Sequence, residues 1–266
     1  MAAPHPRFRG IGKRAWARPG SGCAAPYFAG TNYAIAGART GAVGSPPGVL
    51  AQIGGLGDPN ALYVVVAGGN DMRDARSAFK TNSAVDAAGR EAAAEAAVGS
   101  LVASIGLLAS HGAKHVLISN LPDLGGSPEA ALLGLQYAST DATNRFNALM
   151  PTLLGAGAGA GFGLDMSFLD MAGLLQNVIA DATTNGGATY GITDISSPCA
   201  GFAFSTGPAC SSSLFSDVLH PSAAAHRLIG AAAFAAVVPE PETYALLAFG
   251  LVAVAPAARR RAAVTA

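Results

Sequence analysis

The sequence has little charge, and neither sign is in excess. Its 266 residues include 16 basic and 16 acidic side chains, so charged residues make up only 12% of the chain. A protein that binds nucleic acid normally presents a basic face, and this composition therefore argues against a nucleic-acid partner. Aromatic residues are also few, at 7%, but hydrophobic residues reach 51%, which is enough to form a buried core.

A phosphate-binding loop is lacking as well. The longest glycine-rich run, GAGAGAGFG at residues 155–163, does not have the G-x-G-x-x-G register. It also follows a predicted helix, whereas a dinucleotide-binding loop follows a strand. The sequence therefore argues against a nucleotide-binding α/β domain.

Cysteine is scarce, and the three present are an odd number. Cys199 and Cys210 lie in the loop SPCAGFAFSTGPACSSS, where a disulfide would close a short ring, and Cys23 has no evident partner in the sequence. An unstrained ring of this size would contribute about 3 kcal/mol to stability. Two unpaired thiols are the alternative, and we predict the disulfide.

Hydrophobic periodicity predicts alternating strands and helices after an irregular N-terminus at residues 1–23, which is rich in proline, glycine and arginine. A strand, a helix and a second strand in succession form a βαβ unit, which implies parallel pairing. The expected fold is a three-layer α/β/α domain over residues 24–236 with a mostly parallel sheet. The predicted strands are 62–67, 115–119 and 163–168, and the predicted helices are 87–110, 128–154, 169–180 and 221–236.

The stretch YVVVAGGNDMRD, residues 63–74, joins a predicted core strand to a polar segment. Glycine, asparagine and aspartate tolerate the backbone angles of turns, so a plain polar turn would explain the segment. Loops at the carboxyl ends of strands are also where α/β proteins bind ligands. In that interpretation, the side-chain amide of Asn70 could donate to a developing oxyanion.

A pair of residues suited to proton transfer occurs in LFSDVLHPSAAAHRLIG, residues 214–230. Asp217 and His220 are three positions apart, just before Pro221, which is well placed as the first residue of a helix. The Asp217 carboxylate can reach Nδ1–H of His220 on such a turn, which leaves Nε2 as a base. Alternatively, Ser216 or Asp217 only caps a turn, and His220 merely precedes the helix.

A glycine among small residues stands out in GTNYAIAGART, residues 30–40. Gly37 would allow close approach of the backbone and could offer its N–H to a ligand. An ordinary glycine turn explains the stretch equally well.

In this order, GTNYAIAGART, YVVVAGGNDMRD, VLISNLPDLG and SDVLHPSAAAH resemble successive blocks of the GDSL/SGNH ester hydrolases, most of all their extracellular bacterial lipase and esterase branch. The resemblance covers residues 24–235 and implies an SGNH-hydrolase-like, flavodoxin-like fold. It also implies a small-molecule or lipid ester as substrate, with no metal or organic cofactor. Carried over, Gly37 and Asn70 are oxyanion donors, His220 is the general base, and Asp217 orients it.

One block of that family is not found. The nucleophile of the family lies in a Gly-Asp-Ser block on its first strand, and no Gly-Asp-Ser occurs in this sequence. Ser21, Ser45, Ser119 and Ser216 are poor substitutes by position. We therefore expect that the first strand is missing through a displaced start or a frameshift, and that the chain as written is inactive. The alternative is a non-catalytic exported protein that uses the same scaffold to bind a surface or matrix component.

The C-terminal residues 237–266 have the features of a membrane and sorting segment. An uncharged apolar span at 243–258 is followed by three arginines at 259–261. Its 16 residues would extend about 24 Å as a helix, and the arginines can lengthen it by reaching the interface. We therefore predict a transmembrane helix, with the body of the protein on the outer side of the membrane.

The segment VPEPETYALLAFGLVAVAPAARRR resembles a PEP-CTERM sorting signal. This resemblance implies export, membrane anchoring by the C-terminal helix, and processing by an exosortase-type protease, followed by a location at the cell surface or outside the cell. The first 22 residues carry positive charges without an apolar segment, so we expect no signal peptide within this chain.

Overall fold

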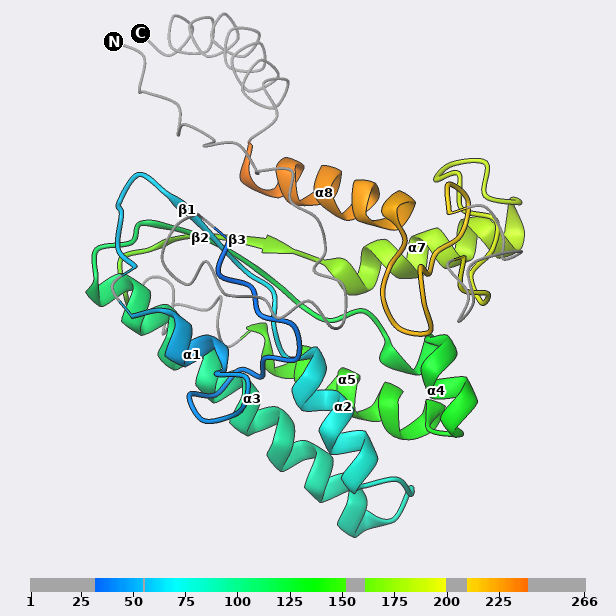
Figure 1. Ribbon diagram of the computed structural model, residues 1–266, viewed down its shortest axis with the longest axis horizontal. Coiled ribbons are helices and arrows are strands. Elements are labelled where there is room, and N and C mark those ends of the chain that lie inside the picture. Colours follow the sequence, from blue (N-terminus) through cyan, green and yellow to red (C-terminus); the bar gives the residue numbers. More distant parts are fainter. Residues whose placement is uncertain (1–31, 55, 152–160, 200–209, 239–266) are drawn as a thin grey trace, which may run out of the picture.

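The computed structural model describes residues 32–54, 56–151, 161–199 and 210–238. These residues form an α/β fold around three parallel strands in the spatial order β1–β2–β3 (Figure 1). The strands are β1 (Leu62–Val65), β2 (His115–Ser119) and β3 (Asp165–Leu169). The helices are α1 (Val49–Gln52), α2 (Gly69–Ala78), α3 (Ala84–Ser110), the 3₁₀ helix η1 (Leu124–Gly126), α4 (Pro128–Leu133), α5 (Gln136–Leu149), α7 (Met171–Thr184) and α8 (Ala223–Val237).

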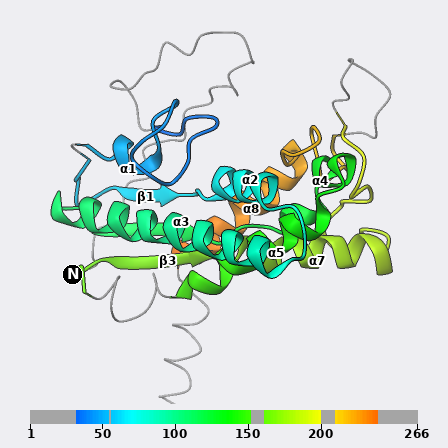
Figure 2. The same ribbon diagram turned by 90° about the horizontal axis from the view of Figure 1, so that it is seen from below.

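The sheet lies between two layers of helices (Figures 1 and 2). Helices α1, α2, α3 and α5 cover one face, and α7 and α8 lie on the other. The register runs from Leu62–His115 to Val65–Ile118 and from His115–Asp165 to Ser119–Leu169, so all three strands run in the same direction. The predicted α/β class and the parallel pairing of the first two strands are therefore confirmed.

The central strand β2 is buried on both faces, as is usual for a parallel strand between two helical layers. Because side chains alternate along a strand, β2 contributes to two separate cores. Val116 and Ile118 pack with α3 and α5, whereas Leu117 packs with α7, α8 and the segment before α8. We call these the α3 core and the α8 core.

The alternative of a plain polar turn after β1 does not hold, because the chain enters helix α2 at Gly69. Gly68 precedes the helix with φ of 108°, a backbone conformation that favours glycine. A Cβ atom on Gly68 would lie 2.5 Å from the ring of Phe146, so the missing side chain also lets this ring pack against the start of α2. The glycines thus end the strand and begin a helix.

The single helix predicted over residues 128–154 is two helices in the structure. Helix α4 ends at Leu133, and Gly134 follows with φ of 65°, which is a common way for a helix to stop. Helix α5 then runs from Gln136 to Leu149. The break lets α4 turn away from α5 toward the loop that precedes α8.

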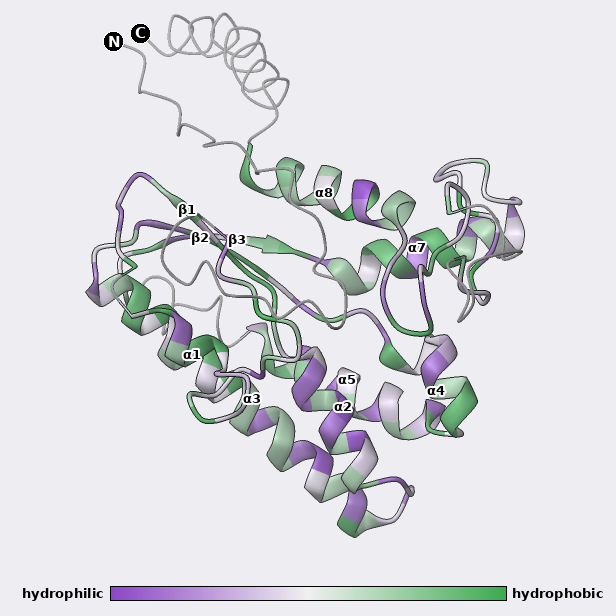
Figure 3. Cartoon of the chain, in the orientation of Figure 1, coloured by the Kyte–Doolittle hydropathy of each residue, from purple (hydrophilic) through white to green (hydrophobic). Residues whose placement is uncertain are grey.

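The last helix begins two residues later than predicted. Ser222, and not Pro221, forms its boundary, because the Ser222 hydroxyl accepts a hydrogen bond from the Ala225 N–H at 3.1 Å. Apart from His226 and Arg227, α8 consists of apolar residues and glycine. Figure 3 accordingly shows this helix as apolar except for one polar band. The remaining predicted elements differ from the structure by four residues or fewer at either end.

Among the described residues, α3 is the one helix long and apolar enough to cross a membrane by length and composition. Leu101, Ile105 and Leu108 on this helix are fully buried in the α3 core, so α3 is the central helix of one layer. The predicted irregular residues 1–23 and the predicted membrane span 243–258 lie outside the described residues.

The sheet is incompletely covered over β1. Within the described part of the chain, β1 has a strand partner on one side only. Val64 is 58% exposed and Val66 is 54% exposed. Val64 pairs with Leu117, so it points toward the same face as the α8 core, but α7 and α8 do not reach it. The described residues therefore leave an apolar surface open beside the β1 edge at this end of the sheet.

Candidate active site

The loop before α8 is shaped by its own backbone hydrogen bonds. The Ser216 N–H donates to the His220 carbonyl at 2.8 Å, and Phe215 forms an antiparallel bridge with Pro221. Inside this closed loop, one carboxylate oxygen of Asp217 accepts hydrogen bonds from the N–H groups of Leu219 at 2.8 Å and His220 at 2.7 Å. The loop is therefore a compact turn that fixes the position of the Asp217 side chain.

The second carboxylate oxygen of Asp217 lies 2.7 Å from Nδ1 of His220. The sequence prediction that these two side chains pair therefore agrees with the geometry of the structure. Partial burial alone would raise the pKa of Asp217, but the N–H groups of His220 and Leu219 and the His220 ring outweigh burial and lower this pKa below its usual value. An ionised carboxylate at Nδ1 favours the tautomer that carries its proton there, so Nε2 is the nitrogen suited to act as a base.

Gly37 forms a tight turn rather than an extended segment. The Ala38 N–H donates to the Ile35 carbonyl at 3.1 Å, and Gly37 has φ of 82° at the third position of this turn. That value is the one a type II turn requires, and it favours glycine. A Cβ atom at Gly37 would meet only Pro46 atoms at an ordinary distance of 3.8 Å, so the conformation and not the available space selects glycine.

Asn70 lies in the first turn of α2 and contacts the Gly37 turn. Its side-chain nitrogen donates to the Ala38 carbonyl at 3.0 Å. The structure thus brings together the two residues for which the sequence predicts oxyanion donation. A side-chain amide has two N–H groups, so one of them can hold the turn while the other serves a ligand.

The residues after Gly37 are bound to α2 by two acidic side chains. The Thr40 N–H and the Thr40 hydroxyl both donate to Asp71, the hydroxyl at 2.8 Å, and Arg39 forms an ion pair with Asp74. Burial raises the pKa of Asp71, and the Thr40 donors offset this effect only in part. Nearby residues of α2 therefore fix the chain segment that carries Gly37.

A chain of contacts connects Asn70 to the Asp217–His220 loop. Arg73 donates from one guanidinium nitrogen to Asn70 Oδ1 at 3.4 Å and from another to the Glu129 carboxylate at 3.0 Å. The backbone N–H of Glu129, in turn, donates to the Val218 carbonyl at 2.7 Å. Val218 lies between Asp217 and His220, so the predicted base and the predicted oxyanion donor are joined through two further residues.

The sequence alone suggests no role for Arg73 or Glu129. Arg73 belongs to the same stretch as Asn70, but its partner is 56 positions away. Glu129 stands in the first turn of α4, where an acidic residue is favourable in any helix, so its sequence context has an ordinary explanation. A contact between distant elements of this kind has no local signature.

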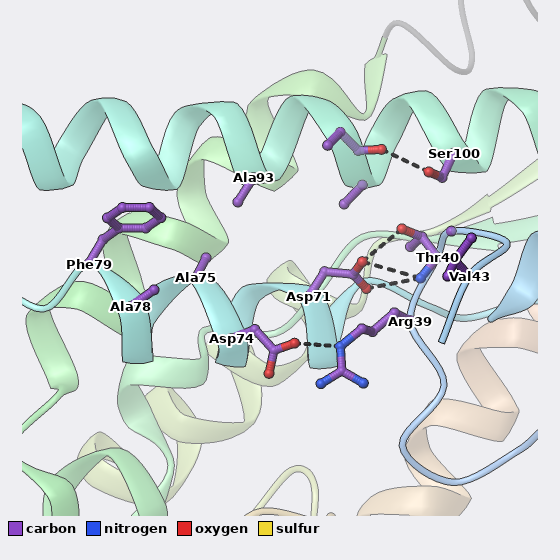
Figure 4. A pocket seen from close by; sticks show the side chains of 13 residues that line it. Arg39, Thr40, Val43, Asp71, Asp74, Ala75, Ala78, Phe79, Ala93 and Ser100 are labelled. Atoms are coloured by element: carbon purple, nitrogen blue, oxygen red, sulfur yellow. Dashed lines mark hydrogen bonds and ion pairs between the residues drawn. The ribbon is translucent and has the colours of Figure 1, made fainter. Parts of the chain in front are cut away.

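A hollow of about 430 Å³ lies on another flank of α2, between α2 and α3 (Figure 4). Its wall includes several alanines of α2 and α3 together with Phe79 and Val43, and the Arg39–Asp74 and Thr40–Asp71 contacts lie along one side. Asp217 and His220 do not line it. The hollow therefore adjoins the Gly37 segment but is separate from the Asp217–His220 pair.

Cys199 and Cys210 form a disulfide in the structure, with their Cα atoms 5.1 Å apart. The Cys199 N–H donates to the Phe215 carbonyl at 3.0 Å, so one end of the disulfide loop is fastened to the base of the Asp217–His220 loop. Within the described residues, no cluster of histidine, cysteine and acidic side chains has the arrangement of a metal site.

Comparison with known proteins agrees with this geometry. The sequence model of the GDSL-like Lipase/Acylhydrolase family matches residues 10–233. The chain belongs to this family. It is also 31% identical, over 192 residues, to a Pseudomonas putida protein described as "Uncharacterized protein in trpE-trpG intergenic region". The matched part is 69% of this chain and 29% of that relative, so the chain spans less than a third of the relative's length.

Proposed function

We propose that this protein is the hydrolase domain of a serine esterase or lipase that transfers the acyl group of a small-molecule or lipid ester to water. The observation that carries the proposal is the 2.7 Å contact between Asp217 and Nδ1 of His220 in a family member. In the reaction, a serine oxygen attacks the ester carbonyl while His220 Nε2 accepts the serine proton. The same nitrogen then protonates the departing alcohol, and water releases the acyl group.

The negative charge that forms on the carbonyl oxygen needs donors that are already in place. The Gly37 N–H and the second N–H of the Asn70 amide are suited to this role, because the Gly37 turn and the start of α2 contact each other through Ala38. No cofactor takes part in this mechanism.

The nucleophile is proposed to come from a Gly-Asp-Ser strand encoded outside residues 1–266. Two observations support this idea. The sequence contains no Gly-Asp-Ser, and β1 presents an unpaired edge, within the described residues, beside the exposed Val64 and Val66. A strand and a following helix at this edge would pair with β1 and cover both valines. The chain as written is then inactive, because a base without a nucleophile cannot form an acyl-enzyme.

We also propose that the protein is exported and held at the membrane by residues 243–258 until an exosortase-type protease processes it. The disulfide between Cys199 and Cys210 supports an oxidising location. Deleting residues 239–266 should release the protein from membranes without loss of its helical circular-dichroism signal. Aggregation together with loss of that signal would mean that the apolar run belongs to the core.

The catalytic proposal is tested by reading the DNA upstream of Met1 in all three frames and expressing the chain with any Gly-Asp-Ser segment found there. The extended protein should hydrolyse p-nitrophenyl esters. Changing the new serine or His220 to alanine should lower the rate by several orders of magnitude, because such residues act as a unit. Asn70→Ala should lower kcat by about 10²–10³-fold. If no such segment exists in any frame, a non-catalytic surface or matrix-binding role replaces the hydrolase.

A further inference from the structure

We infer that Arg73 and Glu129 are positioning residues that hold the oxyanion-donating amide of Asn70 and the base His220 in a fixed relation. This inference rests on the proposed function, since it concerns how two parts of that site are kept together. Neither residue belongs to the pair or the donors predicted from the sequence.

The first step is the orientation of the Asn70 amide. A guanidinium group has only donors, so the Asn70 atom that faces Arg73 must be the oxygen. The nitrogen is then directed to the opposite side, toward the Ala38 carbonyl and the Gly37 turn. Arg73 and the Ala38 carbonyl thus hold the amide from both sides, and loss of Arg73 would leave the Asn70 oxygen without this donor and weaken the hold on the orientation.

The second step is the attachment of the base. The first N–H groups of a helix have no partner within the helix. In α4, the Glu129 N–H is one of these groups, and it donates to the Val218 carbonyl inside the Asp217–His220 loop. The position of the loop therefore depends on where the first turn of α4 lies.

The third step fixes that turn relative to α2. The Glu129 carboxylate accepts from Arg73 and from Arg76, and the Arg76 side chain is only 2% exposed. Arg76 also donates to the Ser139 hydroxyl at 3.0 Å, which ties the same group to α5. Two arginines one helical turn apart on α2 thus bind the side chain of Glu129, and the backbone N–H of Glu129 binds the Asp217–His220 loop.

The test uses the full 266-residue chain and needs no catalysis. Arg73→Met keeps the apolar stem, and it leaves the more deeply buried Arg76–Glu129 pair intact. In ¹⁵N-labelled protein, we expect the Asn70 side-chain amide signals to shift, because the oxygen has lost its donor. Hydrogen exchange at the backbone N–H groups of Glu129 and His220 should become about tenfold faster.

Arg145→Met is the matched control. Arg145 also donates to two partners, Glu91 and Asp141, at a similar exposure, but these contacts join α5 to α3 and do not reach the loop. It should lower stability comparably and leave the Asn70 and His220 signals unchanged. A second pair of variants removes the carboxylate and leaves the arginines: Glu129→Gln next to Arg73 and Arg76, and Asp141→Asn next to Arg90 and Arg145. Glu129→Gln should change the Asn70 and His220 signals, and Asp141→Asn should leave them unchanged.

Unchanged Asn70 signals and unchanged exchange at His220 in Arg73→Met would overturn the inference. Equal changes in Arg145→Met would overturn it as well, because the effect would then follow from general loosening of the fold. Neither result bears on ester hydrolysis, so a failure of the coupling is distinguishable from a failure of the proposed reaction.

Discussion

The two faces of the sheet differ in how completely they are covered. On the α3 core face, helices α1, α2, α3 and α5 bury a continuous set of side chains that extends from β1 to β3. On the α8 core face, α7 and α8 cover β2 and β3, while Val64 and Val66 on and after β1 remain more than half exposed. The residues predicted to act in catalysis lie in the segment before Thr40, at the start of α2, and in the loop before α8.

This difference shows which part of the sheet the described helices cover. A parallel sheet is normally covered on both faces, and its strands are then apolar on both sides. Tyr63 to Val66 follow that pattern, with apolar or aromatic residues at every position, although the described residues leave Val64 and Val66 more than half exposed on one face. The sequence of β1 is therefore suited to a second layer that the described residues do not supply, which supports the proposed additional strand and helix.

The largest effect should come from the covered face. Phe146 is fully buried in the α3 core, and Phe146→Ala should lower the free energy of unfolding by about 3–5 kcal/mol. Phe234 on α8 is 56% exposed and provides a control of the same residue type. Phe234→Ala should change stability by less than about 0.5 kcal/mol. Urea denaturation of both variants measures the contrast, and similar losses would contradict the burial assigned to these two side chains.

The junction of β1 and α2 should be the next most sensitive position. Gly68→Ala must adopt a positive φ and must displace the Phe146 ring, so we expect a loss of about 2–3 kcal/mol. The adjacent Gly69 lies in the helix, and a Cβ atom added there would have no neighbour within 4 Å. Gly69→Ala should therefore be neutral or slightly stabilising in the same denaturation experiment.

A smaller effect on stability should appear at acid pH, where the ion pairs of Glu129 are lost. Burial alone would raise the pKa of Glu129, but Arg73 and Arg76 outweigh it and lower this pKa below its ordinary value of 4.5. The unfolded chain therefore binds a proton at a higher pH than the folded chain does. The stability that the ion pairs contribute is fully present above that ordinary value and is lost as the pH falls through the folded pKa.

Denaturation midpoints measured between pH 7 and pH 3 test this expectation. Glu129→Gln should lose less stability than the unchanged protein over the acid part of the range, because it has no proton to take up there. Burial alone would also raise the pKa of Asp141, but its two arginine partners outweigh burial and lower this pKa. Asp141→Asn should therefore also lose less stability in acid than the unchanged protein does. If neither substitution changes how the denaturation midpoint depends on pH, the ion pairs of Glu129 and Asp141 are contradicted.

The smallest effect should be found on the uncovered face. Val64→Ala in the 266-residue chain should change the free energy of unfolding by less than about 0.5 kcal/mol, because Val64 is already exposed. In a protein extended by the proposed strand, the same substitution should cost about 1–2 kcal/mol, because the valine would be buried. A large cost in the unextended chain would mean that this face is covered in solution.

Strand β2 shows what the sequence can predict well. HVLIS is a short apolar run after a long helix and Gly112, and its observed bounds are the predicted ones. The Asp217–His220 contact can be predicted from the sequence equally well, because the two residues are three positions apart and one local turn joins them. Predictions of this kind depend on neighbours in the sequence.

Helix α2 shows where such reasoning fails. Its buried face consists of Met72, Ala75 and Arg76, and a buried arginine hides the apolar periodicity of the helix. Arg76 is tolerated there because its two terminal nitrogens donate to Glu129 and Ser139, which lie more than fifty positions away. Arg73 and Glu129 are likewise more than fifty positions apart in the sequence. The contacts that connect Asn70 to the Asp217–His220 loop could therefore not be predicted from a local pattern.

The central claim is that Asp217 and His220 serve a serine that residues 1–266 do not contain. Labelling with a fluorophosphonate probe, which reacts with activated serines, tests it most directly. We predict no labelling of the 266-residue chain, and labelling at the Gly-Asp-Ser serine of the extended protein that is lost in His220→Ala. Robust labelling of the 266-residue chain that disappears in His220→Ala would contradict the account, because it would place the nucleophile within these residues.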